Sequence, residues 1–481
     1  MKKRKFYLLL YVVLTLVCSA CEGWLTVEPE TAITGEKLYT TNEGVKEGLN
    51  GLYLNMRGLY YPEGRLGGAS VLESMACTHT FAEGTPGYRW AGHYYNDLSG
   101  DSDIAMIFVG LYNIITNANS LILGTETNKN KLKDEVYNIG RGEALAIRAL
   151  VHLDLIRLFG PVPSNVDMSE KYLPYVRVND IKDYEYNTFE EYMTYLLADL
   201  DEAEALLEKS DIVVTGTFEE TEVSSASWSF RKNHINYYGV LGLQARARLW
   251  KGEVEGALRY ARLVKEAKNG DGTAKVRLMT PDDNTTEGLW NNKTTDLTCY
   301  SEHLCGVKCD NYDYTQGTAW LARNVSILNY SDTFFEDLFA GNAEDMRYQW
   351  FWAYYYNRFG TSGYYCRKYL NFYNSSTSQK NFPIVRLAEM YLIIAENAPL
   401  EEANIIYEEY CKARNLTYVP LTESDREERI LLEFIREFTG EGQNFYTYKR
   451  YNTKNMLFGV RECTEEQYQL PLPESELLND K

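Results

Sequence analysis

The chain has few of the residues, and none of the short motifs, that mark the common enzyme classes. Its 481 residues include only five histidines, scattered between positions 79 and 303. No Gly-x-Ser-x-Gly elbow, no His-Glu-x-x-His pair and no phosphate-binding Gly-x-x-x-x-Gly-Lys loop occurs anywhere in the sequence. The sequence therefore argues against a serine hydrolase, a zinc protease and a P-loop nucleotide-binding protein, because the signature that each chemistry needs is absent.

The arrangement of the cysteines fits neither a disulfide framework nor a metal centre. Of nine cysteines, seven lie beyond the leader and the adjoining Cys21, and an odd number cannot all pair within one chain. Cys299, Cys305 and Cys309 are close in sequence, but their spacing differs from that of a zinc knuckle and only His303 is near enough to add a ligand. We expect no metal and no cofactor, and one local disulfide among these three stays open.

Positive charge is in short supply: 49 lysines and arginines face 68 aspartates and glutamates, which gives a formal net charge of −19. Nucleic-acid binding and electrostatic docking on anionic lipid both need clustered cations, so the composition argues against both. Beyond the leader, no stretch is continuously apolar for 18 residues. We therefore expect no membrane-spanning helix in the mature chain.

The N-terminus is typical of a secretory leader. A basic start, MKKRK, is followed by an apolar run and then by Ser19, Ala20 and Cys21. At about 12–15 residues the run is too short for a permanent bilayer span. A cysteine directly after small residues predicts a lipoprotein signal over 1–20, with Cys21 acylated as the membrane anchor. Ordinary secretion stays open, because Cys18 stands where such signals usually have leucine.

Hydrophobic periodicity predicts a mainly helical fold. In most of the expected helices apolar residues recur at steps of three and four. In a helix that should be buried they cover nearly the whole circumference. Thr188 and Glu191 predict a capping box, and Gly252 suits a left-handed helix end between two neighbouring helices. Two short-linked pairs resemble tetratricopeptide units, although no regular repeat is present. The expected helices are 42–57, 142–163, 188–210, 237–250 paired with 253–267, and 383–398 paired with 400–415.

Long polar and aromatic stretches separate these helices, at 58–102, 211–232, 269–330 and 340–380. They hold many of the chain's 40 tyrosines. Irregular segments of this length are uncommon in a compact domain unless they are functional. We therefore expect a helical scaffold covered by long aromatic-rich loops, with little β-structure.

Six segments, in order along nearly the whole chain, carry a resemblance to a known family. They are EGWLTVEPET after Cys21, LYTTNEGVKEGLNGLY, LYNIITNANSLI with Asn119, GEALAIRALVHLDLIRLFGPVP, VRLAEMYLIIAENA and PLPESEL (471–477). No one of them is specific, but in this order the chain resembles the SusD/RagB family of bacterial lipoproteins. Residues 68–82 lack an acidic motif that many members show, which leaves subfamily and ligand open. The resemblance implies one continuous body, with an N-terminal part at 21–215 and a C-terminal part at 216–481.

The resemblance implies a function that composition alone does not give. Such proteins bind nutrients at the cell surface, usually oligosaccharides and sometimes peptides, and deliver them to a SusC-like TonB-dependent transporter. We therefore expect a non-catalytic binding lipoprotein of the outer membrane, held by its lipid anchor only and facing the cell exterior. A tetratricopeptide-like adaptor for another protein and a glycoside hydrolase are the alternatives.

The segment EFIREFTGEGQNFYTYKRYN (433–452) contains the best candidates for catalytic carboxylates, Glu437 and Glu441. A glycoside hydrolase needs two acids facing each other across a sugar cleft, whereas these acids stand at a helix end broken by Gly440 and Gly442. A phosphate loop would have its glycines before a helix. We expect a structural role, with each buried carboxylate paired by an arginine.

The same reasoning predicts two further ion pairs between residues close in sequence. Glu143 should pair with Arg148, and Arg386 with Glu389, because an arginine three to five residues away is the nearest partner for a buried carboxylate on a helix.

Exposed tyrosine and tryptophan rings can stack on the apolar faces of sugars, while amides and charged groups bind the hydroxyls. The stretch GYRWAGHYYND (87–97) best fits such a surface, and WFWAYYYN (350–357) is so continuously apolar that we assign it to the core. On this hypothesis Trp90→Ala weakens ligand binding and leaves the melting temperature nearly unchanged. The predicted ligand-binding residues are Arg89, Trp90, Tyr94, Tyr95 and Asn96, then Trp320, then Trp290.

Overall fold

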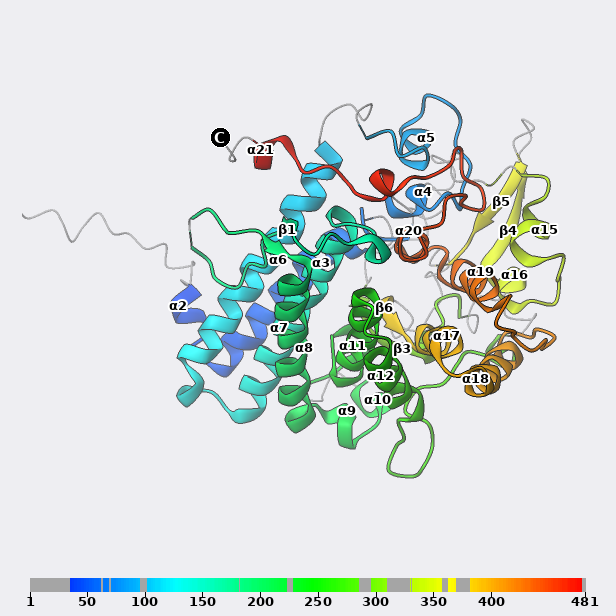
Figure 1. Cartoon of the computed structure of the whole chain (residues 1–481). Coiled ribbons are helices and arrows are strands. Elements are labelled where there is room, and N and C mark those ends of the chain that lie inside the picture. The colour runs from blue at the N-terminus through cyan, green and yellow to red at the C-terminus, as the bar shows by residue number, and fades with distance from the viewer. Residues whose placement is uncertain are drawn as a thin grey trace, which may run out of the picture.

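A computed structural model shows a chain built almost wholly from helices. The structure describes residues 35–61, 64–68, 71–95, 102–180, 182–222, 228–284, 296–308, 329, 331–356, 362–368 and 381–477. Figure 1 shows the helices α3, α6, α7 and α8 on one side of the molecule and α17, α18 and α19 on the other, with the early helix α4 beside the late helix α20. The expected mainly helical fold with little β-structure is confirmed. The leader and Cys21 lie outside the described residues.

Four long helices form the N-terminal half: α3 (Asn42–Tyr60), α6 (Ser102–Thr127), α7 (Asp134–Phe159) and α8 (Phe189–Ser210). α7 packs against the other three and is buried almost all round, as its apolar sequence predicts. α8 begins at the predicted capping box, in which the Thr188 hydroxyl accepts from the Glu191 N–H while the Glu191 carboxylate accepts from the Thr188 N–H.

α6 is, by length and composition, long and apolar enough over Asp103–Thr127 to cross a membrane, and it is the one such helix among the described residues. It packs against α3 and α7, and Ile107, Leu111 and Ile114 are buried. Half of the tested window is buried, so one face of α6 belongs to the core of the bundle.

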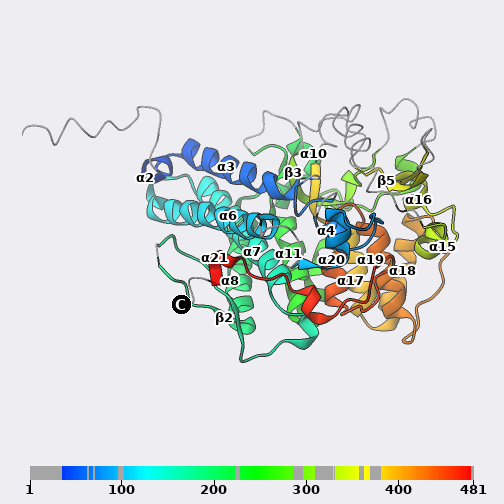
Figure 2. The same cartoon turned by 90° about the horizontal axis from the view of Figure 1, so that it is seen from above.

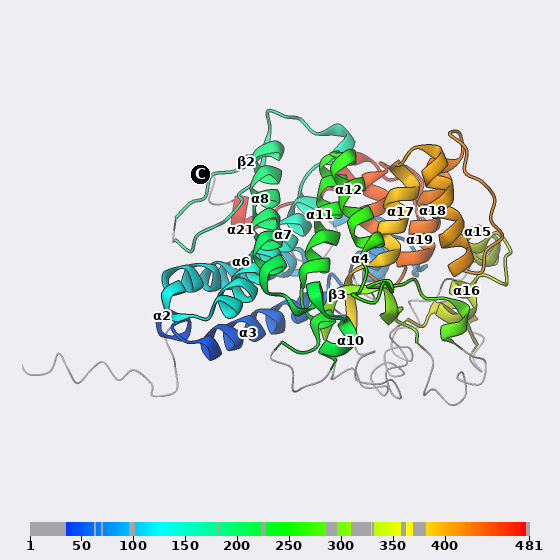
Figure 3. The same cartoon turned by 90° about the horizontal axis from the view of Figure 1, so that it is seen from below.

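Helical hairpins continue the array in the C-terminal half, where α11, α12, α17 and α18 lie side by side (Figure 3). Gly252 ends α11 in the left-handed conformation, with φ +86°, and so turns the chain back into α12. α8, which comes before residue 216, packs on α11, which comes after it. The predicted division of the chain into parts at 21–215 and 216–481 stays a prediction. These helices are α11 (Tyr237–Lys251), α12 (Val254–Glu266), α17 (Leu387–Asn397), α18 (Leu400–Ala413), α19 (Arg426–Phe438) and α20 (Asn444–Arg450).

Shorter helices link the long ones. They are α2 (Gly35–Leu38), α4 (Val71–Met75), α5 (Pro86–Ala91), α9 (Ile212–Thr215), α10 (Phe218–Thr221), α15 (Phe334–Phe339), α16 (Met346–Phe351) and α21 (Glu474–Leu477).

Three two-stranded antiparallel sheets make up the named β-structure of the described chain. They are β1 (Lys171–Leu173) with β2 (Asn187–Thr188), β3 (His303–Lys308) with β6 (Asn381–Arg386), and β4 (Trp352–Tyr356) with β5 (Ser362–Cys366). The prediction of a helix from residue 383 was wrong at its start, because Pro383, Ile384 and Val385 belong to β6. The β-branched side chains of Ile384 and Val385 suit the pairing with β3, and the helix begins only at Leu387.

The β4–β5 hairpin corrects the assignment of 350–357 to the core. Trp350 and Trp352 are buried, but Tyr354 and Tyr356 are 60% and 72% exposed. Trp352, Tyr354 and Tyr356 share one face of β4, since they are two residues apart. The strand therefore runs from the core outward, and Tyr354 and Tyr356 emerge at the surface.

A long C-terminal strap, residues 464–473, returns from the C-terminal half to the N-terminal bundle (Figures 1 and 2). The Leu470 N–H donates to the Leu158 carbonyl at 2.9 Å, and the Gln469 side-chain amide donates to the Phe159 carbonyl at 2.9 Å. Both contacts are at the end of α7, so the strap fastens the last part of the chain onto the first half.

Candidate functional site

Arginines hold the first candidate catalytic glutamate, Glu437, in the core. Its side chain has no exposed surface. Arg414 donates to both of its carboxylate oxygens at 2.8 and 2.9 Å, Arg386 adds a bond of 2.5 Å, and the Tyr410 hydroxyl adds one of 2.6 Å. With both oxygens engaged and no open face, this carboxylate has no room for a substrate or a water nucleophile.

The second candidate, Glu441, is clamped in the same way. Lys368 donates to one of its oxygens at 2.7 Å and Arg386 donates to the other at 2.8 Å. The prediction that cations pair these two carboxylates is confirmed.

Cys299, Glu302 and Glu437 bring three possible metal-ligand atoms within 4.8 Å of one another. Arg414 bonds both glutamates, and Arg386 does so too. Guanidinium groups thus occupy the oxygens that a metal would need and repel a cation from the same point. The residues present do not fit a metal.

Electrostatics keep Glu437 ionised. Burial alone would raise its pKa, but the charges of Arg414 and Arg386 more than offset burial and hold the pKa well below the ordinary value. A general acid for glycoside hydrolysis needs the opposite, a pKa raised toward neutrality.

Both short-range ion pairs predicted from sequence were wrong. Glu143 bonds Arg231, which is 88 residues away, and Arg148 bonds Asp199 through two contacts of 2.6 and 2.7 Å. Residues five apart lie about 140° apart around a helix, so Glu143 and Arg148 face different neighbours. Glu389 likewise pairs with a distant arginine on α11, at 2.6 and 2.7 Å.

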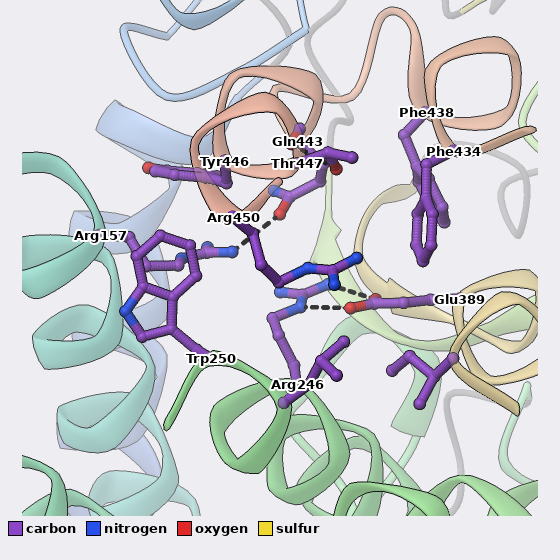
Figure 4. A pocket seen from close by; sticks show the side chains of 12 residues that line it. Arg157, Arg246, Trp250, Glu389, Phe434, Phe438, Gln443, Tyr446, Thr447 and Arg450 are labelled. Carbon is purple, nitrogen blue, oxygen red and sulfur yellow. Dashed lines mark hydrogen bonds and ion pairs between the residues drawn. The ribbon is translucent and has the colours of Figure 1, made fainter. Parts of the chain in front are cut away.

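Figure 4 shows the ion pair of Arg246 and Glu389 inside a small cavity between α7, α11, α17, α19 and α20. The cavity volume is about 40 Å³, which is room for about one or two water molecules. The guanidinium of Arg246 faces the carboxylate of Glu389, and Arg157 points toward Gln443. This space is too small for a sugar, so we assign these charges to the stability of the core.

A larger cleft, of about 570 Å³, opens between the chain just after α5 and the C-terminal strap. That volume is within the range of ordinary ligand pockets, about 300–1,000 Å³. The residues lining it mix rings, amides and both signs of charge: His93, Tyr94, Tyr95, Arg461, Glu466, Gln467, Gln469, Leu470, Pro471 and Leu472.

Contacts across the cleft fix its two walls. The Tyr95 hydroxyl donates to the Gln467 carbonyl at 2.6 Å. The Arg461 guanidinium lies 4.1 Å from the centre of the Tyr94 ring and donates to the His93 carbonyl at 3.2 Å. His93 itself is left-handed, with φ 52°, a conformation that few non-glycine residues adopt outside a constrained turn.

The predicted binding residues have different outcomes. Tyr94 and Tyr95 are partly exposed and line the cleft. Arg89 is also partly exposed, at the end of α5. Trp90 is only 4% exposed, so its ring has no open face for a sugar and Trp90→Ala should lower stability. Asn96, Trp290 and Trp320 lie outside the described residues, and their roles stay predictions.

Sequence reasoning missed the opposite wall of the cleft. Arg461 and Gln467 are far from Tyr95 in the sequence, and Gln467, which the Tyr95 hydroxyl bonds, lies 372 residues after it. Their local sequence, RECTEEQYQL, has no periodicity or motif that indicates a site. The closing PLPESEL segment was the only nearby signal, and it pointed to a family rather than to a pocket.

Comparison with known proteins gives two matching family models. One described as "SusD family" matches residues 308–475, and one described as "Starch-binding associating with outer membrane" matches residues 47–223. A curated relative, SusD-like protein P25 of Formosa agariphila, is 27% identical over 171 residues. That alignment takes in 32% of this chain and only 30% of the relative.

Solved structures share the fold over nearly the whole chain. A SusD superfamily protein of Bacteroides thetaiotaomicron has a TM-score of 0.67 at 19% identity and covers 91% of this chain and 97% of its own. A SusD-like carbohydrate binding protein of Bacteroides vulgatus has a TM-score of 0.66 at 18% identity, with 91% and 96% covered. Surface glycan-binding protein A of Bacteroides thetaiotaomicron, in complex with laminarihexaose, has a TM-score of 0.62 at 16% identity, with 92% and 98% covered.

Proposed function

Because the chain belongs to the SusD/RagB family, we propose that it is a cell-surface lipoprotein that binds oligosaccharide. On this proposal it passes the ligand to a partner TonB-dependent transporter in the outer membrane and is itself no enzyme. The observation that carries the binding role is the cleft between Tyr94 and the C-terminal strap, which offers an aromatic wall, amides and both signs of charge in about 570 Å³.

The chemistry of the cleft suits a sugar. Pyranose rings have apolar faces, which pack on aromatic rings, and a rim of hydroxyls, which bond amides and charged groups. Tyr94 supplies a partly exposed ring, Arg461 supplies a donor over one side of that ring, and Glu466 supplies an acceptor in the same lining. The hydroxyl bond of Tyr95 to the strap holds this arrangement before any ligand arrives.

The non-catalytic part of the proposal rests on the acids. Glu437 and Glu441, the pair that sequence analysis singled out, are buried and paired by cations. Glu466 is the one carboxylate among the described residues that line the cleft, whereas glycoside hydrolysis uses a pair.

Attachment and location follow from the leader and from the name of the N-terminal family model, which refers to the outer membrane. We propose that acylated Cys21 holds the protein at that membrane with its body outside the cell. The formal net charge of −19 disfavours docking on an anionic lipid surface, which is consistent with attachment through the lipid alone.

Calorimetry on a panel of neutral hexasaccharides (malto-, cello-, laminari-, xylo- and mannohexaose) tests the binding role. We expect the mature protein to bind at least one of them. Arg461→Ala should weaken that binding about 10- to 100-fold, the scale of a lost charged hydrogen bond. Lys454→Ala is the matched control, because Lys454 is an exposed cation of the same segment that does not line the cleft. Absence of binding across the panel, or equal binding by both variants, would contradict the proposed cleft.

A further inference from the structure

A second open groove lies on the N-terminal bundle and shares no lining residue with the cleft. It has a volume of about 650 Å³ and runs between α6 and the segment that joins β1 to β2, with α21 at one end. Figure 1 shows α21 and that segment beside α6. We name it the tyrosine groove. Its lining residues are Phe108, Val109, Tyr112, Asn113, Thr116, Pro174, Val176, Val178, Asn179, Asp180, Lys182, Asp183, Tyr184, Tyr186 and Glu476.

Hydrogen bonds fasten the outer wall of the groove onto α6. The Asn179 side-chain amide donates to the Thr116 carbonyl and to the Ser120 hydroxyl, both at 2.8 Å. The Tyr112 hydroxyl donates to the Pro174 carbonyl at 3.3 Å. These contacts bridge the two walls at the start and in the middle of the segment, so the groove does not depend on a ligand to form.

The ring of Tyr184 is held in place by its own hydroxyl. That oxygen accepts from the Asp180 N–H at 3.0 Å and lies 2.8 Å from the Val178 carbonyl, to which it donates. A ring fixed in this way loses little conformational entropy when a ligand packs on it. Tyr184 therefore combines a built position with a partly exposed surface.

The groove lining combines apolar and polar surfaces. Val109 and Val178 are 51% and 47% exposed, and with the tyrosine rings they give an apolar surface that is open to solvent. Asn113, Asp180 and Asp183 are exposed residues of the same lining and offer hydrogen-bonding groups. Apolar surface beside amides and carboxylates matches the two surfaces of a pyranose ring.

Charge decides which sugars fit. Three carboxylates line the groove, from Asp180, Asp183 and Glu476, against one ammonium group, from Lys182. Lys182 pairs with Asp180 at 3.2 Å, so the ammonium group is already partly neutralised. A uronate or a sulfated sugar would meet an excess of like charge, whereas a neutral sugar would not.

We propose that the tyrosine groove is a second binding site of this protein, for the neutral sugar residues of an oligosaccharide. The inference rests on the proposed function, because it assigns the same ligand class to a separate surface. Two sites on one molecule allow a long glycan to be held at two points, and the second contact then forms at a high effective concentration.

Substitution from the exposed face of α6 tests the groove without disturbing the core. Asn113→Trp places a large side chain in the groove, and Asn117→Trp is the matched control, since Asn117 is an exposed asparagine of the same helix outside the groove. Equal melting temperatures of both variants and the wild type would show that folding is unchanged. The probes are the five neutral hexasaccharides above, and polygalacturonate as an acidic glycan.

For the neutral probes that bind, we expect calorimetry to give two sites per wild-type molecule, one per Asn113→Trp molecule and two per Asn117→Trp molecule. Arg461→Ala should affect the other site. Unchanged binding by Asn113→Trp, together with weakened binding by Arg461→Ala, would overturn the groove and leave the proposed function standing. No binding of any neutral probe by the wild type would overturn both. Binding of polygalacturonate that Asn113→Trp abolishes would overturn the assignment to neutral sugars.

Discussion

Replacing Glu437 by glutamine separates a structural acid from a catalytic one. The change keeps the shape of the side chain but turns one accepting oxygen into an NH₂ group, which only donates. In the structure Arg414 bonds both oxygens and Arg386 and Tyr410 bond one each. Whichever oxygen is replaced, at least two donors lose their acceptor and then face another donor.

The cost follows from burial. Glu437 has no exposed surface, so water cannot satisfy the donors that are left, and the charge that balanced two arginines is gone. Removing one partner from a buried ion pair costs about 3–5 kcal/mol. A folded domain is more stable than its unfolded state by only about 5–15 kcal/mol, so this loss is a large share of the total stability. Because the native pKa of Glu437 is depressed, the stability it confers is present above its unfolded pKa and is lost as pH falls through the native value. The deficit of the variant should be greatest near neutral pH.

Urea denaturation followed by tryptophan fluorescence measures the effect. We expect a lower midpoint for Glu437→Gln and an unchanged one for Glu428→Gln, a control at an exposed glutamate of the same helix. Below the transition, the folded variant should bind the hexasaccharide that the wild type binds, within about twofold. A Glu437→Gln protein of full stability that has lost binding, or that fails in a hydrolysis shown by the wild type, would refute a purely structural role.

Three further outcomes are expected. Burial raises the pKa of Glu73 to about 7 from an ordinary value of 4.5, so the native state favours the protonated acid and loses about 3 kcal/mol of stability as pH rises from 4.5 to 7. The free energy of unfolding of Glu73→Gln should therefore match that of the wild type at pH 4.5 and exceed it at pH 8. A variant that is less stable than the wild type at pH 8 would contradict this. Trp90→Ala should lower the free energy of unfolding by about 3–5 kcal/mol in the same urea assay, and unchanged stability would show that the ring is not packed as described. Cys21→Ala should appear in the soluble fraction of the producing cell instead of the membrane fraction, and retention in membranes without a bound partner would place the anchor elsewhere.

Local signals in the sequence predicted the helices well where the cause of the structure is itself local. The capping box of Thr188 and Glu191 starts α8, and Gly252 ends α11, because each acts within about one turn of its own helix. The long helix α7 was also predictable, since a helix that is apolar on nearly all sides is stable only when it is buried in the core.

Features that depend on distant partners were not predictable. Ile384 and Val385 alone did not distinguish a strand from the start of a helix, because β6 is defined by its pairing with β3, some 75 residues earlier. The partner of Glu143 is 88 residues away, and helical spacing alone favoured the wrong arginine. Tyr354 and Tyr356 looked like core residues because composition does not reveal that their strand leaves the body of the protein.

The C-terminal strap gives the cleft an order of assembly. Tyr95 is made early in synthesis, whereas Gln467, which its hydroxyl bonds, follows 372 residues later. The N-terminal helices can pack while the chain is still growing, but one wall of the cleft arrives only with the last segment. Closing so long a loop is slow compared with forming helical hairpins from neighbouring residues. A partly made or clipped chain could therefore contain most of the helical body and still have no closed cleft, so ligand binding at this site reports that the whole chain has folded.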